Sequence, residues 1–448
     1  PHRYINHTHS SAVLSLTNQP NGEDLCREVF GERMGLVPYI MPGFALAKRS
    51  AEIFQQNPSV DGLVLLKHGI FTFGDTAREA YECMVEAVTL VEKRLKRGRR
   101  PVFATTFSEA GGEIQQRQIA DVAPVIRGAV SINDGESREY KNFILDFRSN
   151  VQILEYVNGR ELDRYSQAGV ATPDHTIRTK NWPMVVPSSE FGHIDVSRSA
   201  VDRAVAAFED KYHGYFKRNS VQYDRNLRQL DPRPRVVLVP GLGLFGIGRT
   251  ISDAKIAADI AESTVETITD AESIGTFESV SESDLFDIEY WSLEQAKLAG
   301  AKERRLTGNI VVVTGGGGTI GRATANAFEQ EGAVVILLDL QESLTQPIKD
   351  NSFITLECDV TDKVSVRKSF DKICEVVGGV DIVVSNAGAP WMGKIGVVED
   401  ELLRESFELN FFAHQTVAQN AIRVMRAQGT GGVLLFNVTK QALNPGMD

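Results

Sequence analysis

Two histidines near the start of the chain have a spacing that could do chemistry. His7 and His9 lie in the segment from Tyr4 to Ser11, with one residue between them. If this segment is a strand, both side chains point to the same face, because side chains alternate along a strand with a period of two. Two imidazoles with Cα atoms about 7 Å apart can converge on one zinc ion through bonds of about 2.0–2.1 Å. The pair therefore indicates a candidate metal site.

A second candidate site lies between Asn309 and Asp339. Asn309 to Thr314 is a β-branched run without polar alternation, as expected for a strand buried on both faces. Gly315 to Gly318 can turn sharply and approach a ligand closely, and the helix predicted after them would direct free N–H groups at that ligand. Asp339 ends the next apolar strand, where a ribose needs an acceptor. The stretch predicts a dinucleotide site, and Asp339 favours NAD over NADP because a carboxylate repels a 2′-phosphate.

The composition limits the remaining possibilities. The chain has 448 residues, 42% apolar and 24% charged, which predicts two or three globular domains. Its net charge of −11 disfavours a nucleic-acid partner. The four cysteines are scattered without a CxxC pair, which fits reduced thiols and predicts a cytoplasmic location. No apolar run approaches the roughly 20 residues of a membrane span, so we expect no membrane partner.

The elements that must position the histidines read as a hairpin and a helix. Asp61 to Lys67 is an apolar strand that ends in His68-Gly69, and Thr76 to Lys96 has helical apolar spacing. The His-x-His pair, a third histidine 59 positions later and the long helix resemble the class II aldolase/adducin superfamily over residues 1–97. That resemblance implies that a divalent metal, usually zinc, is held by three ligands, and that a proton-transferring glutamate lies upstream. The implied metal ligands are His7, His9 and His68; the alternative is that they are ordinary structural histidines.

Residues 98–302 are predicted to form an α/β middle region of unclear role. Phe143 to Phe147 and Val151 to Tyr156 read as short strands. Asp174-His175 could be a catalytic pair, although an Asp beside a His more often marks a turn or a helix start. Arg235 to Gly248 contains GxGxxG, but no apolar strand with an acidic tip follows its helix. We therefore interpret that run as a structural strand–turn–helix unit and not as a second dinucleotide site.

Residues 303–448 alternate strands and helices, which predicts right-handed crossovers and a parallel sheet with helices on both faces. The motifs TGGGGTIG, CDVTD, SNAG and ELN resemble those of the short-chain dehydrogenase/reductase family. The resemblance implies a Rossmann domain with Asn410 and Thr439 as catalytic residues. The implied cofactor contacts are Thr314, Gly315, Gly316, Gly317, Gly318, Thr319, Ile320, Gly321, Asp339, Asp359, Val360, Asn386, Ala387 and Gly388.

Two departures from the family patterns affect the functional expectation. Thr319 stands where a glycine is usual, which would make the turn less open to pyrophosphate. The Tyr-x-x-x-Lys pair, in which Lys lowers the pKa of the Tyr general acid/base from about 10, does not follow Thr439. The chain also starts at Pro1 without a methionine. We therefore expect a fragment truncated at both ends that binds NAD weakly and turns over neither substrate.

The predicted fold class is α/β, with a partial aldolase/adducin-like domain, an α/β middle region and a truncated, doubly wound Rossmann sheet. The combination resembles fusions of a rhamnulose-1-phosphate aldolase-like domain with a short-chain dehydrogenase. It implies metal-dependent cleavage of a ketose 1-phosphate, in which a metal polarises the ketone oxygen, and NAD-dependent oxidation of the aldehyde or alcohol product. A sugar-phosphate epimerase fused to a dehydrogenase and a non-catalytic adducin-like module remain alternatives. We expect sugar-phosphate and aldehyde substrates and a homo-oligomer.

Overall fold

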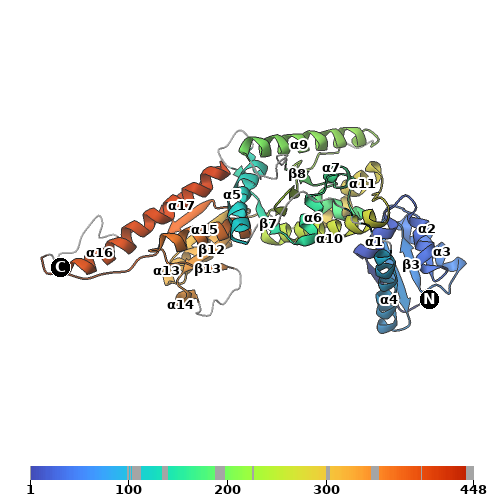
Figure 1. Cartoon of the computed structure of the whole chain (residues 1–448), viewed down its shortest axis with the longest axis horizontal. Coiled ribbons are helices and arrows are strands. Elements are labelled where there is room, and N and C mark those ends of the chain that lie inside the picture. The colour runs from blue at the N-terminus through green and yellow to red at the C-terminus, as the bar shows by residue number, and fades with distance from the viewer. Residues whose placement is uncertain are drawn as a thin grey trace.

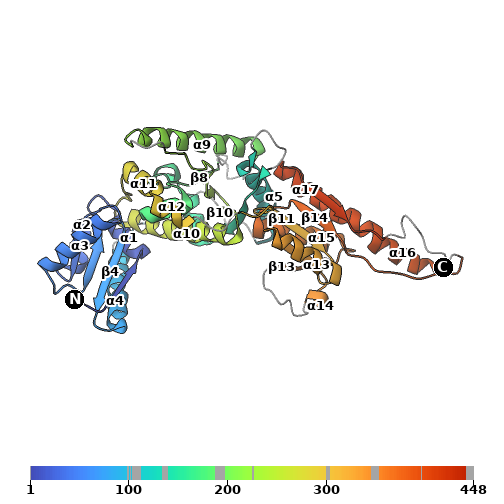
Figure 2. The same ribbon diagram turned by 180° about the vertical axis from the view of Figure 1, so that it is seen from behind.

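The computed structural model of the chain describes residues 2–97, 100, 102, 112–133, 140–186, 197–223, 227–298, 303–344, 353–394 and 396–439. They form three units, which we call the first (2–97), the second (112–298) and the third (303–439). The first and third units lie at opposite ends of an elongated molecule, with the second between them (Figures 1 and 2). Among the described residues, no helix combines the length and apolar character needed to span a bilayer.

The first unit is built on a four-stranded sheet. In order across the sheet, its strands are β1 (Tyr4–Thr8), β4 (Gly69–Gly74), β3 (Gly62–Leu65) and β2 (Met34–Val37). β1 and β3 each pair antiparallel with β4, and β2 pairs parallel with β3. The register sets His7 opposite Phe71, so the histidine end of β1 lies beside the start of β4. The helices of this unit are α1 (Ser11–Thr17), α2 (Gly22–Phe30), α3 (Phe44–Gln56) and α4 (Ala77–Lys96).

The long helix α4 fixes β4 in place. Thr76 and Glu79 form a capping box, in which each side chain accepts a hydrogen bond from the other residue's backbone N–H. Such a cap contributes about 1 kcal/mol to helix stability. One face of α4 packs against β4 and the core of the first unit. The buried residues of that face recur at helical spacing and are Ala80, Met84, Ala87, Val91 and Leu95.

The second unit contains a sheet with the same topology. In order across the sheet, its strands are β7 (Ile144–Arg148), β10 (Gly243–Gly248), β9 (Val236–Val239) and β8 (Met184–Val185). β10 pairs antiparallel with both β7 and β9, and β8 pairs parallel with β9, as in the first unit. The longer helices around it are α5 (Gly112–Val130), α9 (Arg198–Ser220) and α10 (Ile251–Ile274). The shorter elements are β5 (Ile132–Asn133), β6 (Tyr140–Lys141), α6 (Val151–Val157), α7 (Leu162–Tyr165), η1 (Pro173–His175), α8 (Thr176–Thr179), α11 (Glu282–Glu289) and α12 (Ser292–Leu298).

The sequences of the first two units repeat along with the topology. Thr250 caps α10 by accepting a hydrogen bond from the N–H of Asp253, as Thr76 caps α4. The residues at the hairpin and the helix start, Gly69, Phe71, Gly74 and Thr76, recur 174 positions later as Gly243, Phe245, Gly248 and Thr250. The second unit is therefore a structural repeat of the first.

Two predictions for the middle region were wrong. Val151 to Tyr156 was expected to be a strand but lies in α6, because the Asn150 side chain caps the helix by accepting a hydrogen bond from Ile153. The GxGxxG run was expected to be a strand–turn–helix unit, but it forms the antiparallel hairpin of β9 and β10. A Cβ at Gly246 would lie 2.3 Å from the Ala254 carbonyl oxygen, so a glycine there permits α10 to pack closely on β10.

The third unit is a five-stranded parallel sheet, in agreement with the predicted Rossmann fold. Its strand order is β13 (Ile354–Glu357), β12 (Val334–Asp339), β11 (Ile310–Thr314), β14 (Ile382–Ser385) and β15 (Val433–Phe436). Alternate residues of β11 enter two different cores, so both faces of the sheet are covered. The helices are α13 (Thr319–Gln330), α14 (Gln341–Leu344), α15 (Lys363–Val377), α16 (Asp400–Phe407) and α17 (Ala413–Gln428).

Candidate functional site

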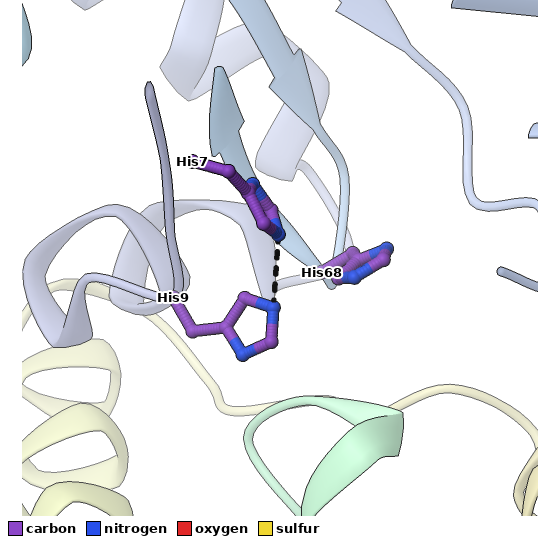
Figure 3. Close-up of side chains that lie close together, drawn as sticks. All are labelled: His7, His9 and His68. Carbon is purple, nitrogen blue, oxygen red and sulfur yellow. Dashed lines mark hydrogen bonds between the residues drawn. The ribbon is translucent and has the colours of Figure 1, made fainter. Parts of the chain in front are cut away.

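The three histidines of the first unit converge at one end of its sheet (Figure 3). His7 lies on β1, His9 directly follows that strand, and His68 lies in the turn between β3 and β4. One ring nitrogen from each residue can be chosen so that all three lie within 4.8 Å of one another. Within the part of the chain that the structure describes, this is the group of histidine, cysteine or acidic side chains with a geometry suited to a metal ion.

The hydrogen bonds of His7 set its ring in the orientation that a metal ligand needs. Its Nδ1 lies 3.1 Å from the Ile70 carbonyl oxygen, which can only accept, so Nδ1 carries the proton and Nε2 presents a lone pair. That Nε2 lies 3.1 Å from Nε2 of His9. Two nitrogens bound to one tetrahedral zinc are about 3.3 Å apart, so the observed pair is close to a ligating geometry. Metal-ligating histidines typically donate their other ring N–H to a carbonyl or carboxylate oxygen, as Nδ1 of His7 does to Ile70.

The other two rings are held in the neutral form that binds metals. Burial lowers the pKa of His68 to about 4, although the Asp174 charge acts in the opposite direction. Burial also lowers the pKa of His9; the Asp174 charge opposes this effect and His7 adds to it. The Nδ1 atom of His68 is buried and has no hydrogen-bond partner. A buried ring nitrogen left without a partner fits a site whose remaining contact is a metal ion.

Gly69 permits the three rings to approach one another. A Cβ at this position would lie 2.6 Å from the Thr8 carbonyl oxygen and 3.0 Å from Cδ2 of His9. Real Cβ atoms do not come this close to a backbone oxygen, so a side chain here would push β1 away from the turn. The HG pair therefore needs its glycine for steric reasons.

The second unit does not repeat the histidines. Strand pairing makes Phe147 the equivalent of His7, because it pairs with Phe245 as His7 pairs with Phe71. Counting along the two strands and the two hairpins gives Ser149 in place of His9 and Leu242 in place of His68. The second unit has thus kept the fold of the first without its ligand set.

The cofactor residues predicted in the third unit surround one large pocket. The pocket has a volume of about 1130 Å³ and opens at the carboxyl ends of the strands, where parallel α/β sheets bind ligands. His414, which was not predicted from the sequence, also lines the pocket. Its Nδ1 lies 2.6 Å from Oγ of Ser385. The predicted residues that line the pocket are Gly315, Gly318, Thr319, Ile320, Gly321, Asp339, Asp359, Val360, Asn386, Ala387, Gly388, Asn410 and Thr439.

Three of the predicted cofactor contacts, Thr314, Gly316 and Gly317, are not among the residues that line the pocket. The Thr314 hydroxyl accepts hydrogen bonds from the N–H groups of Asn386 and Ala387, and so joins the glycine turn to the SNAG motif. Gly316 packs on β12, and Gly317 packs on Ser343. These residues shape the turn around Gly315, whose φ of +64° and close approach to Ala387 favour glycine.

Asp339 connects the tip of β12 to the glycine turn. Its Oδ2 accepts a hydrogen bond of 2.8 Å from the N–H of Gly317, and its Oδ1 accepts one of 2.8 Å from Leu340. Each carboxylate oxygen keeps a further lone pair, and the residue lines the pocket. Asp339 is therefore held at the pocket wall with hydrogen-bond acceptors still available.

Asn410 lies between the helices α16 and α17. Residues Glu408–Phe412 form a π-helical turn between α16 and α17, a feature often found at functional sites. The Asn410 side chain accepts from the N–H of Ala389 and donates to its carbonyl oxygen, at 3.2 and 3.0 Å. The side chain thus fixes the loop after β14. Thr439 lies in the exposed segment that follows β15. It lines the same pocket.

Three family models match the chain, one to each unit. Residues 1–95 match the class II aldolase and adducin N-terminal domain, residues 117–298 match the second domain of class II aldolase, and residues 309–445 match the short-chain dehydrogenases. The chain joins class II aldolase domains to a short-chain dehydrogenase domain. The middle region, whose role was unclear from its sequence, is thereby assigned to the aldolase part.

Relatives of known sequence support the same division. An uncharacterized oxidoreductase, YuxG, of Bacillus subtilis (strain 168) is 30% identical over 463 aligned positions, which cover all of this chain and 65% of the relative. An NAD-dependent glycerol dehydrogenase of Listeria innocua is 32% identical over 144 residues, 32% of this chain and 56% of that enzyme. The chain thus spans about two thirds and just over half of the lengths of these relatives.

Solved structures align with about a third of the chain. The crystal structure of gox2181 is 26% identical, with a TM-score of 0.30, and the match covers 31% of this chain and 57% of that one. A short-chain type dehydrogenase/reductase from Mycobacterium marinum is 26% identical, with a TM-score of 0.31 over 32% of this chain and 60% of that one.

Proposed function

We propose that the protein is a two-site enzyme of carbohydrate metabolism. Its aldolase part would cleave a ketose 1-phosphate of the rhamnulose-1-phosphate type with the help of a divalent metal. Its dehydrogenase domain would then oxidise the aldehyde, or interconvert it with the alcohol, by hydride transfer to or from NAD. The observation that carries the proposal is the convergence of three imidazole nitrogens within 4.8 Å in an aldolase domain of the same chain as a dinucleotide pocket.

The residues of the first unit fit a divalent metal, with zinc as the expected ion. The donor set consists of three imidazoles, and a zinc ion held by them would have at least one further coordination position. A bound metal would polarise a ketone oxygen and stabilise the charge that develops there when the C–C bond breaks. His7, His9 and His68 would hold it, and the hydrogen bond from His7 to the Ile70 carbonyl oxygen would orient the first of these rings.

The residues of the third unit fit NAD. The N-terminus of α13 begins directly after the glycine turn, where it favours a pyrophosphate. The carboxylate of Asp339 would accept hydrogen bonds from the adenosine ribose and repel a 2′-phosphate. Asn410 would keep the loop beyond β14 in the position that the reaction needs, and Thr439 would contribute a hydroxyl beside the substrate. The likeness to an NAD-dependent glycerol dehydrogenase supports NAD as the cofactor and an alcohol as one member of the substrate pair.

The two reactions would be linked by diffusion. The second unit separates the histidine site from the cofactor pocket, which lies in the third unit at the other end of the molecule (Figure 1). An aldehyde formed at the first site would therefore reach the second through solvent. Addition of a competing aldehyde-trapping reagent to the full-length enzyme would interrupt the coupled reaction.

Metal analysis and cofactor titration test the proposal. We expect the purified chain to contain one zinc or a similar divalent ion, and to bind NADH more tightly than NADPH in a fluorescence titration. In a protein of the length of its relatives, ketose 1-phosphate should be cleaved to an aldehyde and dihydroxyacetone phosphate. Epimerisation without cleavage would support the epimerase alternative. Absence of both metal and NADH binding would overturn the proposal.

A further inference from the structure

The second unit brings a carboxylate to the histidine site. Asp174, in η1, lies with its Oδ2 3.9 Å from Nε2 of His9, the same nitrogen that faces Nε2 of His7. The His175 ring lies on the same side, with its centroid 6.3 Å from that of His9. The Asp174 carboxylate thus faces the point at which the three rings converge, although it lies more than 100 residues away in the chain.

Three buried side-chain atoms of the Asp174 segment have no hydrogen-bond partner. The Oδ1 atom of Asp174 is buried and makes no hydrogen bond. Oγ1 of Thr172 and Nδ1 of His175 are also buried without hydrogen-bond partners. Leaving a buried polar atom unpaired destabilises a protein, and the effect is greater for a charged carboxylate. Three such atoms lie in the four consecutive residues from Thr172 to His175, and Asp174 and His175 lie beside His9. The segment is therefore arranged to meet a ligand.

The position of Asp174 is fixed by contacts that begin at the histidine turn itself. Lys67, the residue before His68, donates hydrogen bonds to Glu278 at 2.5 Å and to the Ser279 carbonyl oxygen at 3.0 Å. The Ser279 hydroxyl in turn donates to the carbonyl oxygen of Val170, at the start of the segment that leads to η1. The Asn18 side chain donates to the next carbonyl oxygen, that of Ala171, at 2.7 Å. The histidine turn and the Asp174 segment are therefore held together as one assembly.

Lys67 adopts a backbone conformation that suits this role. Its φ is +59°, in the left-handed region that an L side chain rarely adopts, and its equivalent in the second unit is Gly241, with φ of +82°. The first unit thus carries a lysine where the repeat carries the unstrained residue. This conformation is unfavourable for an L residue, and the hydrogen bonds to Glu278 and Ser279 stabilise it.

We propose that Asp174 is a fourth protein ligand of the metal held by His7, His9 and His68, so that the metal site is completed across the boundary between the two aldolase units. The inference rests on the metal site of the proposed function. Zinc accepts carboxylate oxygen at about 2.0–2.2 Å, which sets neighbouring ligand atoms about 3.3 Å apart. A small rotation of the Asp174 side chain covers the difference from the present 3.9 Å. Substrate would enter by expansion of the coordination number to five.

A ligand role for Asp174 would give the second unit a function in the aldolase site although it lacks metal-ligating histidines of its own. Phe147 occupies the position equivalent to His7, so the repeat cannot form a triad of its own. Its η1 segment instead faces the triad of the first unit. The carboxylate would offset one of the two positive charges of a bound ion and would tie the second unit to it, so metal binding should stabilise the contact between the units.

Metal-binding measurements on variants of the whole chain test the proposal. We would compare Asp174→Ala, which removes the carboxylate, and Asp174→Asn, which keeps its shape, with Asp163→Asn, a control at an exposed carboxylate of α7. Zinc affinity would be measured by competition with a chromophoric chelator, and ligand geometry by the visible absorption of bound cobalt(II). We expect Asp174→Ala to lose at least about tenfold in zinc affinity, to change the cobalt spectrum, and to lose part of the metal-induced rise in Tm. The control should match the unmodified chain.

Each outcome separates the inference from the function on which it rests. If the unmodified chain binds no divalent metal, the proposed aldolase site fails. If it binds metal and both Asp174 variants bind with the same affinity and the same cobalt spectrum, Asp174 is not a ligand and the inference fails. Loss of affinity with an unchanged spectrum would also overturn it, because Asp174 would then act without contacting the ion. Circular dichroism of the metal-free variants checks folding, and the Asp174→Asn variant decides the matter if Asp174→Ala does not fold.

Discussion

Arg127 and Asp381 form a buried ion pair that joins the second unit to the third. The two guanidinium Nη atoms donate to the two carboxylate oxygens at 2.8 and 2.6 Å. Arg127 is fully buried, and its remaining donors reach the carbonyl oxygens of Phe143 and Gly308. Asp381 in turn accepts from the N–H of Ile310, the first residue of β11. The aldolase part is therefore connected directly to the central strand of the dehydrogenase sheet.

Breaking this pair should destabilise both domains. Arg127→Met leaves the Asp381 carboxylate buried without its partner, and loss of one member of such a pair costs about 3–5 kcal/mol. Urea unfolding should show this loss and a separation of the single transition into two. Arg218→Met provides the control, because the Arg218–Glu282 pair is largely exposed and should contribute less than about 1 kcal/mol. An equal effect of the two substitutions would contradict the prediction.

The equivalent glycines of the two aldolase units should respond differently to substitution. Gly69→Ala places a Cβ 2.6 Å from the Thr8 carbonyl oxygen, and Gly243→Ala places one 2.4 Å from that of Arg148. Each should lower the free energy of unfolding by about 1–3 kcal/mol, because both hairpins must move. Only Gly69→Ala should weaken zinc binding, because His7 and His9 lie beside that turn. The chelator competition assay checks this, and unchanged zinc affinity in Gly69→Ala would count against the assigned site.

Features that depend on local sequence could be predicted from it. His7 and His9 share a face because of strand alternation, and the strand–glycine–helix order of the third unit follows from residues close together in the chain. The helix α6 was missed because its apolar run looks continuous, whereas its buried residues Ile153, Tyr156 and Val157 recur at helical spacing after a capping Asn150. A closer count of that spacing would have found it.

The approach of Asp174 to the histidines could not be predicted in this way. Asp174 and His9 come together only because two units dock, and no local pattern encodes that contact. A usable signal for the second unit was nevertheless present. The glycine, phenylalanine and threonine spacing of the β3–β4 hairpin recurs at β9–β10, so a search for internal repeats would have assigned the middle region to the aldolase part.

The metal-free protein should lose stability as the pH falls from about 6.5 to about 4. Burial lowers the pKa of His68 and of His175 to about 4 in the folded state, whereas an unfolded histidine titrates near 6.5. The unfolded chain therefore binds more protons across this interval, and protonation favours unfolding. At pH 5 each of these two histidines should lower the free energy of unfolding by about 1–2 kcal/mol relative to pH 7. Urea unfolding at pH 7 and pH 5 measures the difference in the free energy of unfolding. We expect this difference to be smaller in His175→Gln. An equal difference in His175→Gln and the unmodified chain would contradict the prediction.

The cofactor preference should depend on the charge of Asp339. Asp339→Asn keeps one oxygen, which can accept from Gly317 or from Leu340 but not from both, and removes the charge that repels a 2′-phosphate. Because hydrogen bonds to charged groups contribute about 1.5–3 kcal/mol, we expect NADH affinity to fall by about tenfold or more, and NADPH affinity to rise. Asp359→Asn is the control: Asp359 lines the same pocket but bonds to Thr361 and not to the glycine turn. That variant should weaken both cofactors alike. Fluorescence titrations with NADH and NADPH measure the ratio, and a preference unchanged in Asp339→Asn would show that another residue selects the cofactor.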